Sequence, residues 1–123
     1  MPGLTVAGGA VARRRLSQVI ARKRPPADAW LVEPEGFSLP SRHTTLAVLA
    51  VGAALHAVGF RGAPACAVTA LAAASTGTSR VCLGVHWPAD VVAGWLFAEA
   101  WLNLTAPDSW RARPAHRGET IRP

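Results

Sequence analysis

The sequence predicts an all-α fold, a membrane helical bundle of about three transmembrane helices preceded by a partial N-terminal helix. Three observations lead to this prediction. Hydrophobic residues make up 50% of the 123 residues, and they cluster in runs. Arg61 is the only Lys, Arg, Asp or Glu between Thr44 and Thr78, and such depletion of charge is typical of segments in lipid. Turn-forming residues separate three apolar runs, which predicts separate helices.

The first 26 residues are expected to form the partial N-terminal helix, which ends in a basic segment. Arg13 to Arg15 interrupt its apolar residues, and we interpret them as a basic patch that faces lipid headgroups, not as catalytic residues. Pro25-Pro26 is expected to end the helix, because proline lacks the backbone N–H that a helix needs. Residues 27–42 have the Pro, Gly and acidic composition of an extramembrane loop.

Residues 43–106 are expected to contain the three apolar helices, at residues 44–60, 63–75 and 89–106. The first run is near the lower limit of about 17 residues for crossing a bilayer, the second run is below that limit, and the third run is long enough. The remaining residues, 107–123, carry several arginines and are expected to form a disordered basic tail. The whole chain is thus interpreted as a single domain.

The distribution of charge predicts the topology and the class of partner. Three successive spans would place the polar loops on one face, and Arg61 with the basic tail on the other. Because cytoplasmic ends are enriched in Lys and Arg, we expect a multi-pass protein of the cell membrane with a cytoplasmic tail and extracytoplasmic polar loops. The net charge of +6 favours the bilayer or a phosphate-bearing ligand as partner. Nucleic acid is not expected, because no module that reads nucleic acid is visible.

One polar stretch, residues 79–90, lies between two apolar runs and is expected to form a catalytic loop. Pro88 fits the first turn of a helix, so His86 would lie where the loop meets that helix. Asp90 follows four residues later, within reach of the imidazole. Arg80 would approach from the loop with a permanent charge. The stretch therefore predicts a base, a residue that orients it and an arginine that binds an anion.

Two further basic clusters are expected on the same face. Pro40-Ser41-Arg42-His43 opens the first apolar run, where the N–H groups of a helix N-terminus favour an anion and Ser41 can act as the cap. Arg22-Lys23-Arg24-Pro25 ends the N-terminal segment. Three separate segments would thus bring their arginines and histidines to one membrane surface.

These segments resemble the three motifs of the type 2 phosphatidic acid phosphatase (PAP2) superfamily of membrane lipid phosphatases, which is related to the vanadium haloperoxidases. The family pattern is Lys-x6-Arg-Pro, then Pro-Ser-Gly-His, then Ser-Arg-x5-His-x3-Asp. The third motif is complete here as Ser79, Arg80, His86 and Asp90. The second motif has Arg42 in place of Gly, and the first has Ser17 in place of Lys. The resemblance covers about residues 17–104.

The resemblance implies a role for each matching residue. Arg24 and Arg80 would clamp a phosphate, assisted by Ser41, Arg42 and Ser79. His86 would attack phosphorus to form a phosphohistidine, with Asp90 fixing its tautomer. His43 would protonate the leaving oxygen and then activate the water. No metal and no other cofactor is implied, because arginines supply the charge that phosphoryl transfer requires.

The two departures from the motifs have different implications. Ser17 removes one phosphate contact, which implies a lower rate or an altered headgroup preference. Arg42 puts a side chain where the family has none, and it would either crowd the backbone around the phosphate or add a cation to the site. The sequence leaves both effects of Arg42 open.

The resemblance implies a hydrolase of a lipid phosphate or diphosphate, such as phosphatidate or a polyprenyl diphosphate of the undecaprenyl type. The alternative is a catalytically degenerate membrane protein that binds lipid phosphate or has a role in assembly. The family core usually has six spans, with the first motif after the third. The chain is therefore expected to be N-terminally truncated and to correspond to the C-terminal half of that core. A homo-oligomer could complete the scaffold.

Overall fold

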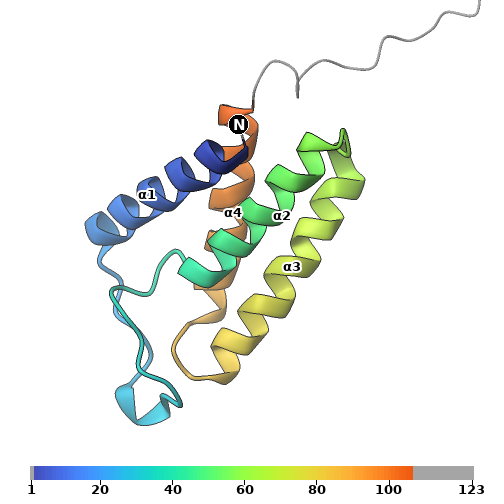
Figure 1. The fold of residues 1–123 in the computed structure, drawn as a ribbon. Coiled ribbons are helices and arrows are strands. Elements are labelled where there is room, and N and C mark those ends of the chain that lie inside the picture. Colours follow the sequence, from blue (N-terminus) through green and yellow to red (C-terminus); the bar gives the residue numbers. More distant parts are fainter. Residues whose placement is uncertain (1, 107–123) are drawn as a thin grey trace, which may run out of the picture.

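The computed structural model describes residues 2–106, and these residues form four α-helices and one short 3-10 helix, with no strand (Figure 1). The elements in chain order are α1 (Pro2–Ile20), η1 (Ala27–Ala29), α2 (Arg42–Ala57), α3 (Gly62–Cys82) and α4 (Pro88–Thr105). The predicted all-α class is therefore confirmed for this part of the chain. The predicted basic tail lies outside the described residues.

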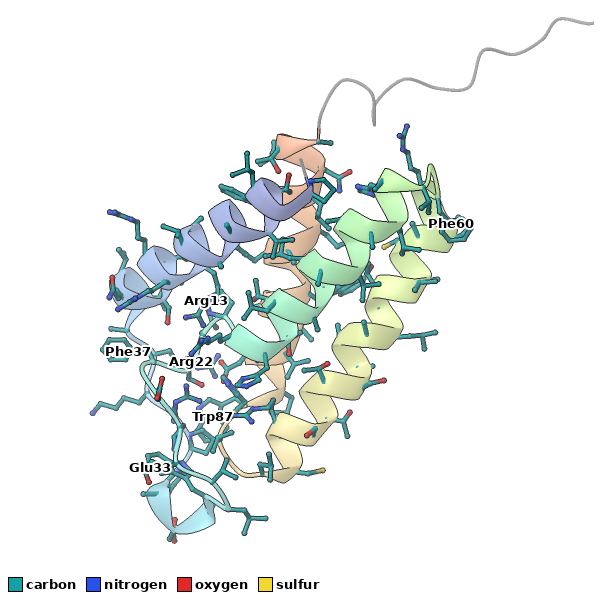
Figure 2. All side chains as sticks on the ribbon, viewed as in Figure 1. Arg13, Arg22, Glu33, Phe37, Phe60 and Trp87 are labelled. Atoms are coloured by element: carbon teal, nitrogen blue, oxygen red, sulfur yellow. The ribbon has the colours of Figure 1, made fainter. Side chains whose placement is uncertain are left out.

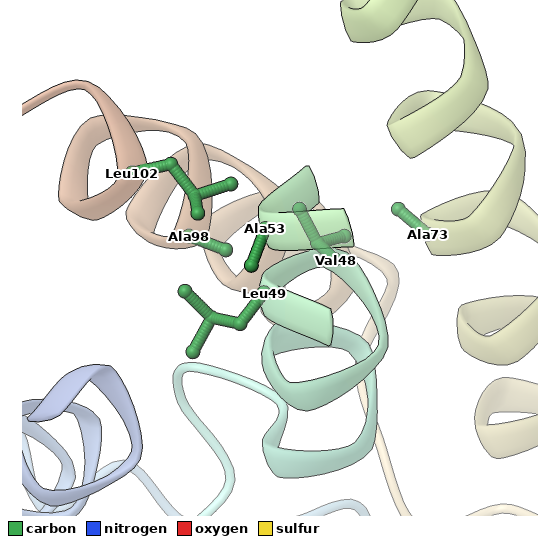
Figure 3. Packing of buried hydrophobic residues seen from close by; sticks show 6 residues of the cluster. All are labelled: Val48, Leu49, Ala53, Ala73, Ala98 and Leu102. Atoms are coloured by element: carbon green, nitrogen blue, oxygen red, sulfur yellow. The ribbon is translucent and has the colours of Figure 1, made fainter. Parts of the chain in front are cut away.

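Helix α2 is central to the bundle and packs against the other three helices. Its inner face contributes three aliphatic side chains to the core, and α3 and α4 contribute the others. Figure 3 shows the complete cluster, which consists of Val48, Leu49, Ala53, Ala73, Ala98 and Leu102. Because several of these side chains are small, the helix backbones can approach closely at native packing density.

Helix α1 lies against the core through one stripe of residues at four-residue spacing. Thr5, Gly9 and Ser17 are buried members of this stripe. A Cβ on Gly9 would lie 2.7 Å from Leu49 Cδ1, so only glycine permits this approach. Residues four apart share a helix face, and Arg13 belongs to the same stripe. The packing of α1 therefore directs Arg13 and Ser17 toward α2.

Helix α1 ends earlier than the sequence predicts. It stops at Ile20, and Ala21 adopts a left-handed conformation with φ of 50°. A left-handed residue is a common C-terminal end of a helix, and the Ala21 N–H donates to the Ser17 carbonyl at 2.9 Å. The basic segment that contains Arg24 is therefore in a loop, not in a helix that continues to Pro25.

Helix α3 ends later than predicted, which corrects the expected loop at residues 79–90. The helix continues from the apolar run through Cys82 and includes Ser79 and Arg80. Its inward residues recur every four positions, as Ala65, Thr69, Ala73 and Gly77. This face of small residues packs against α2 and α4 along the helix. It continues beyond the point where Ser and Thr end the run of apolar residues. The turn to α4 is consequently short, at residues 83–87.

The length and apolar character needed to cross a bilayer do not occur together in any helix of residues 2–106. The three predicted transmembrane helices are thus not identified as spans in this part of the chain.

Candidate active site

The three predicted segments meet at one end of the bundle. The loop after α1, the start of α2 and the turn between α3 and α4 all lie at this end (Figure 1). Backbone hydrogen bonds join them, because the Ser41 N–H donates to the Asp90 carbonyl at 3.0 Å and the Leu31 N–H donates to the Leu83 carbonyl at 2.9 Å. Figure 2 shows Arg22 and Trp87 in this region.

The start of α4 positions His86 and Asp90. Pro88 is the first helical residue and Trp87 the N-cap, and the Trp87 N–H donates to Asp90 Oδ2 at 2.8 Å. The same oxygen lies 3.2 Å from His86 Nδ1. Both side chains are buried, with exposures of 3% for His86 and 0% for Asp90. One carboxylate thus caps the helix and orients the histidine.

Asp90 is held as a carboxylate by its surroundings. The Ser38 hydroxyl donates to Asp90 Oδ2, and Arg22 Nη1 lies 3.4 Å from Oδ1. Burial alone would raise the pKa of Asp90, but the hydrogen bonds from His86, Ser38 and the Trp87 N–H outweigh it and lower the pKa below its usual value. Because a carboxylate only accepts hydrogen bonds, the proton of neutral His86 resides on Nδ1. Its Nε2 then carries a lone pair.

Arg24 lies on the Nε2 side of His86. Its Nη1 is 3.2 Å from His86 Nε2 and donates to the Val85 carbonyl at 2.8 Å. Its Nε and Nη2 groups donate to three carbonyls of the loop after α1, those of Glu35, Gly36 and Phe37. Burial and the Arg80 charge lower the pKa of Arg24, although Asp90 opposes them. Arg24 is therefore a cation held by several hydrogen bonds beside His86 Nε2.

Arg80 and His43 also lie at this end of the bundle, where the Arg80 charge acts on both His43 and Arg24. The Arg80 Nε is buried and has no hydrogen-bond partner among residues 2–106. Burial lowers the pKa of His43, and the charges of Arg80, Arg42 and Arg24 lower it further. His43 is therefore neutral at pH 7 in the ligand-free state. It lies close enough to Arg24, Arg42 and Arg80 for their charges to act on it.

Comparison with known protein families identifies the family to which the chain belongs. The family model described as the PAP2 superfamily matches residues 5–114. The chain belongs to the PAP2 superfamily. No curated protein and no solved structure gives a significant match. Membership in the PAP2 superfamily indicates phosphatase-type hydrolysis in general.

The second PAP2 motif surrounds the N-terminus of α2. Ser41 is buried and its hydroxyl oxygen accepts the Thr44 N–H at 3.4 Å, so it acts as the predicted cap. Arg42 has a negative φ, because Ala21 is the only non-glycine residue with a positive φ in the described part of the chain. Its Nη1 lies 3.7 Å from Glu35 Oε2 on the surface. Of the two effects left open for Arg42, an added cation fits better than a crowded backbone.

The first PAP2 motif adjoins a cavity of about 630 Å³ between α1 and α2. Ser17, at the lysine position, is 3% exposed and lines it. Arg13, Arg14 and Arg42 also line this cavity. The loss of the lysine therefore leaves space at a site that is still rich in cations.

Sequence reasoning predicts Ser79 as a phosphate-binding residue, and this role stays a prediction. Ser79 is exposed on the last turn of α3, and none of the side-chain hydrogen bonds within residues 2–106 involves it. The helix extends about two turns further than predicted, so Ser79 has the orientation of a helical residue rather than of a flexible loop.

Sequence reasoning also missed residues that contact the site. Ser38, which lies outside all three motifs, contacts Asp90. Arg22 also contacts Asp90: its basic cluster was predicted on this face, but this contact was not, because both contacts depend on how the loop folds. Arg13 was interpreted as part of a headgroup-facing patch. Its four-residue spacing from Ser17 is the signal that could have placed it on the inner face of α1.

Proposed function

We propose that this chain is a phosphatase that hydrolyses a lipid phosphate or diphosphate through a phosphohistidine at His86. The observation that carries the proposal is the environment of His86. A buried carboxylate lies 3.2 Å from Nδ1, and an arginine lies 3.2 Å from Nε2. This arrangement presents the Nε2 lone pair toward the place where an arginine would hold a phosphate.

The charge of the site supports binding of a phosphate. Arg24, Arg80 and His43 lie near one another. The Asp90 carboxylate already accepts hydrogen bonds from His86, Ser38 and the Trp87 N–H. An anion would relieve the mutual repulsion of Arg24 and Arg80, and guanidinium groups bind phosphate oxygens through charge-assisted hydrogen bonds. Such groups also stabilise the charge that phosphoryl transfer places on the equatorial oxygens.

In the first step, His86 Nε2 forms a bond to phosphorus as the bond from phosphorus to the leaving oxygen breaks. Asp90 stabilises the positive charge that develops on the imidazole. The bound phosphate raises the pKa of His43, because an opposite charge favours the imidazolium. Protonated His43 then gives its proton to the leaving oxygen.

In the second step, neutral His43 takes a proton from water, and the water oxygen attacks phosphorus. The bond from phosphorus to Nε2 breaks, which releases inorganic phosphate and restores neutral His86. Each proton given in the first step is recovered from water in the second, so the site returns to its initial state.

A lipid substrate is supported by the outer surface of the bundle. Large apolar side chains are exposed on three helices, including Leu4 at 72%, Val19 at 83%, Leu71 at 68% and Leu96 at 55%. Such surfaces are typical of membrane or protein contacts. We therefore place the reaction at a membrane, and the extracytoplasmic side of the site stays a prediction from charge.

A second candidate function is binding of lipid phosphate without hydrolysis. Two observations favour it: Ser17 stands at the lysine position of the first motif, and the Ser79 side chain is exposed. Such a site would still have its cations, but it would bind phosphate weakly or in the wrong position, so the rate of hydrolysis would be low.

The test is release of phosphate from a lipid diphosphate and from phosphatidate by the full chain in lipid nanodiscs. His86→Ala is expected to lower kcat by a factor on the order of 10³ or more, because the nucleophile is lost. His56→Gln is the matched control, since His56 lies near the other end of α2. The wild type should also accumulate an acid-labile phosphoryl group that His86→Ala lacks.

Equal release by wild type and His86→Ala would refute the catalytic proposal. Binding of the lipid phosphate by both proteins without any release would instead establish the second candidate function.

A further inference from the structure

Arg13 extends from α1 to the second motif. Its Nη1 donates to the Pro40 carbonyl at 2.9 Å, immediately before the buried cap residue Ser41. Figure 2 shows Arg13 between α1 and the N-terminal end of α2. The side chain is half-buried, and the α1 stripe that contains Gly9 and Ser17 fixes its direction. Arg13 is thus part of the site end of the bundle, not of a surface patch.

The charges around Arg13 are those of the candidate site. Burial lowers the pKa of Arg13, and the charges of Arg42, Arg24 and Arg14 lower it further. No carboxylate forms an ion pair with Arg13 within residues 2–106. A half-buried arginine surrounded by other arginines is stabilised when an anion binds among them. Arg13 therefore has the surroundings of a residue that binds an anionic ligand.

Arg24 alone offers few donors to a phosphate. A guanidinium has five N–H groups, and those of Arg24 point to four carbonyls and to His86 Nε2. Only the N–H that faces His86 points toward the reacting phosphate. The other phosphate oxygens consequently need donors from other side chains, and Arg80 is one of them.

Ser17 cannot supply the missing charge, but Arg13 can. The two residues are one helical turn apart, about 6 Å along the axis, and both line the cavity of about 630 Å³. We propose that Arg13 is a phosphate-binding residue of this site, which provides from α1 the cation that Ser17 lacks. The proposal rests on the proposed function, because it concerns the phosphate group of the same substrate.

The test compares Arg13→Gln with Arg15→Gln in the full chain. Both variants remove one charge from α1, but Arg15 is exposed and does not line the cavity. Arg13→Gln should lower kcat/KM by about 10- to 100-fold, the effect of losing a hydrogen bond to a charged group. Its inhibition constant for inorganic phosphate should rise by a similar factor. Arg15→Gln should change neither value by more than about twofold.

Rescue separates a binding role from a structural one. Arg13→Gln with Ser17→Lys returns a cation to the cavity without restoring the bond to Pro40. If Arg13 acts by binding phosphate, this double variant should regain most of the lost phosphate affinity. If Arg13 only fixes the Pro40 loop, the double variant should stay as weak as Arg13→Gln, which would overturn the proposal.

Direct binding of inorganic phosphate, measured by calorimetry, distinguishes failure of the Arg13 proposal from failure of the proposed hydrolase function. A wild type that binds phosphate but hydrolyses nothing, with weaker binding only in Arg13→Gln, supports Arg13 while it refutes the hydrolase. Equal phosphate affinity and equal kcat/KM in wild type and Arg13→Gln overturn the role of Arg13 while the hydrolase stands. A wild type that neither binds nor hydrolyses refutes both.

Discussion

At the residue scale, Asp90 holds together several parts of the site. Its side chain accepts hydrogen bonds from His86, from the Ser38 hydroxyl and from the Trp87 N–H. Its own carbonyl accepts the Ser41 N–H. One residue thereby joins the proposed nucleophile His86, the loop after α1, the α4 cap and the start of α2, so its substitution should affect both rate and stability.

Asp90→Asn should lower kcat by a factor on the order of 10³ to 10⁴, because an amide can hold His86 in the wrong tautomer. Phosphate release from a lipid diphosphate measures this loss. The matched control is Asp28→Asn, which changes an exposed carboxylate in η1. An Asp90→Asn variant with wild-type kcat would contradict the assigned orientation of His86.

The lowered pKa of Asp90 also predicts how the stability of the fold depends on pH. Its folded-state pKa is lowered, so the unfolded chain binds this proton more readily than the folded chain. The stabilisation is fully present above the unfolded pKa of about 3.9 and is lost as the pH falls through the folded pKa. Melting temperatures between pH 2 and 7 should therefore fall more steeply below pH 4 in wild type than in Asp90→Asn, and parallel curves would contradict the shift.

The pair of His86 and Asp90 could be predicted from the sequence, whereas their other partners could not. The spacing of four residues across Pro88 places His86 just before the helix and Asp90 in its first turn, which is local geometry. Ser38 and Arg22 reach Asp90 only because the loop folds back across the end of the bundle. Such contacts depend on tertiary structure, and no spacing rule encodes them.

At the element scale, Gly84 ends α3 and allows the loop to pass beside it. Its φ is 77°, which a side chain disfavours. A Cβ there would also collide with the Ala29 carbonyl oxygen. The adjacent Leu83 carbonyl accepts the Leu31 N–H at 2.9 Å. The turn before His86 and the loop after α1 are therefore packed as one unit.

Gly84→Ala should destabilise the fold by more than Gly36→Ala. Gly36 also has a positive φ, of 67°, but a Cβ there would meet nothing within 4 Å. Gly36→Ala should therefore cost only the conformational strain of about 1–2 kcal/mol, and Gly84→Ala adds the collision. Denaturant unfolding in detergent measures both free energies, and equal values would show that the loop adjusts freely.

The helices could be predicted from apolar runs more reliably than their ends. Helix α4 begins at Pro88, as its position before an apolar run predicts. Helix α3 extends beyond Ser75 because Gly77 continues its buried face at four-residue spacing. Hydropathy detects the loss of apolar residues there, but not the continued packing against α4. Helix α1 ends before Pro25 because the left-handed turn at Ala21 comes first.

At the scale of the whole molecule, exposed apolar side chains predict attachment to lipid. Val92 and Leu96 lie one turn apart on α4, with exposures of 52% and 55%. Val92→Ser with Leu96→Ser should reduce by about tenfold or more the partition of the chain into phosphatidylglycerol vesicles, because two apolar side chains lose their transfer free energy. Flotation of the vesicles measures the bound fraction.

Ala100→Ser is the control for this prediction, since it changes a small exposed residue on the same helix. Unchanged flotation of the double variant would contradict lipid contact through α4. Flotation that is absent in wild type, together with a dimer in solution, would assign this face to a second copy of the chain.

The hydrogen bond between Arg24 and His86 blocks the proposed nucleophilic nitrogen while no phosphate is bound. The N–H of Nη1 that faces Nε2 occupies the lone pair needed for attack. One N–H cannot serve both the imidazole and a phosphate oxygen at full strength, so an arriving phosphate competes with the histidine for it. Capture of that donor by the substrate uncovers the nucleophile at the moment when a target is in place. An empty site, by contrast, keeps its most reactive atom covered against stray electrophiles.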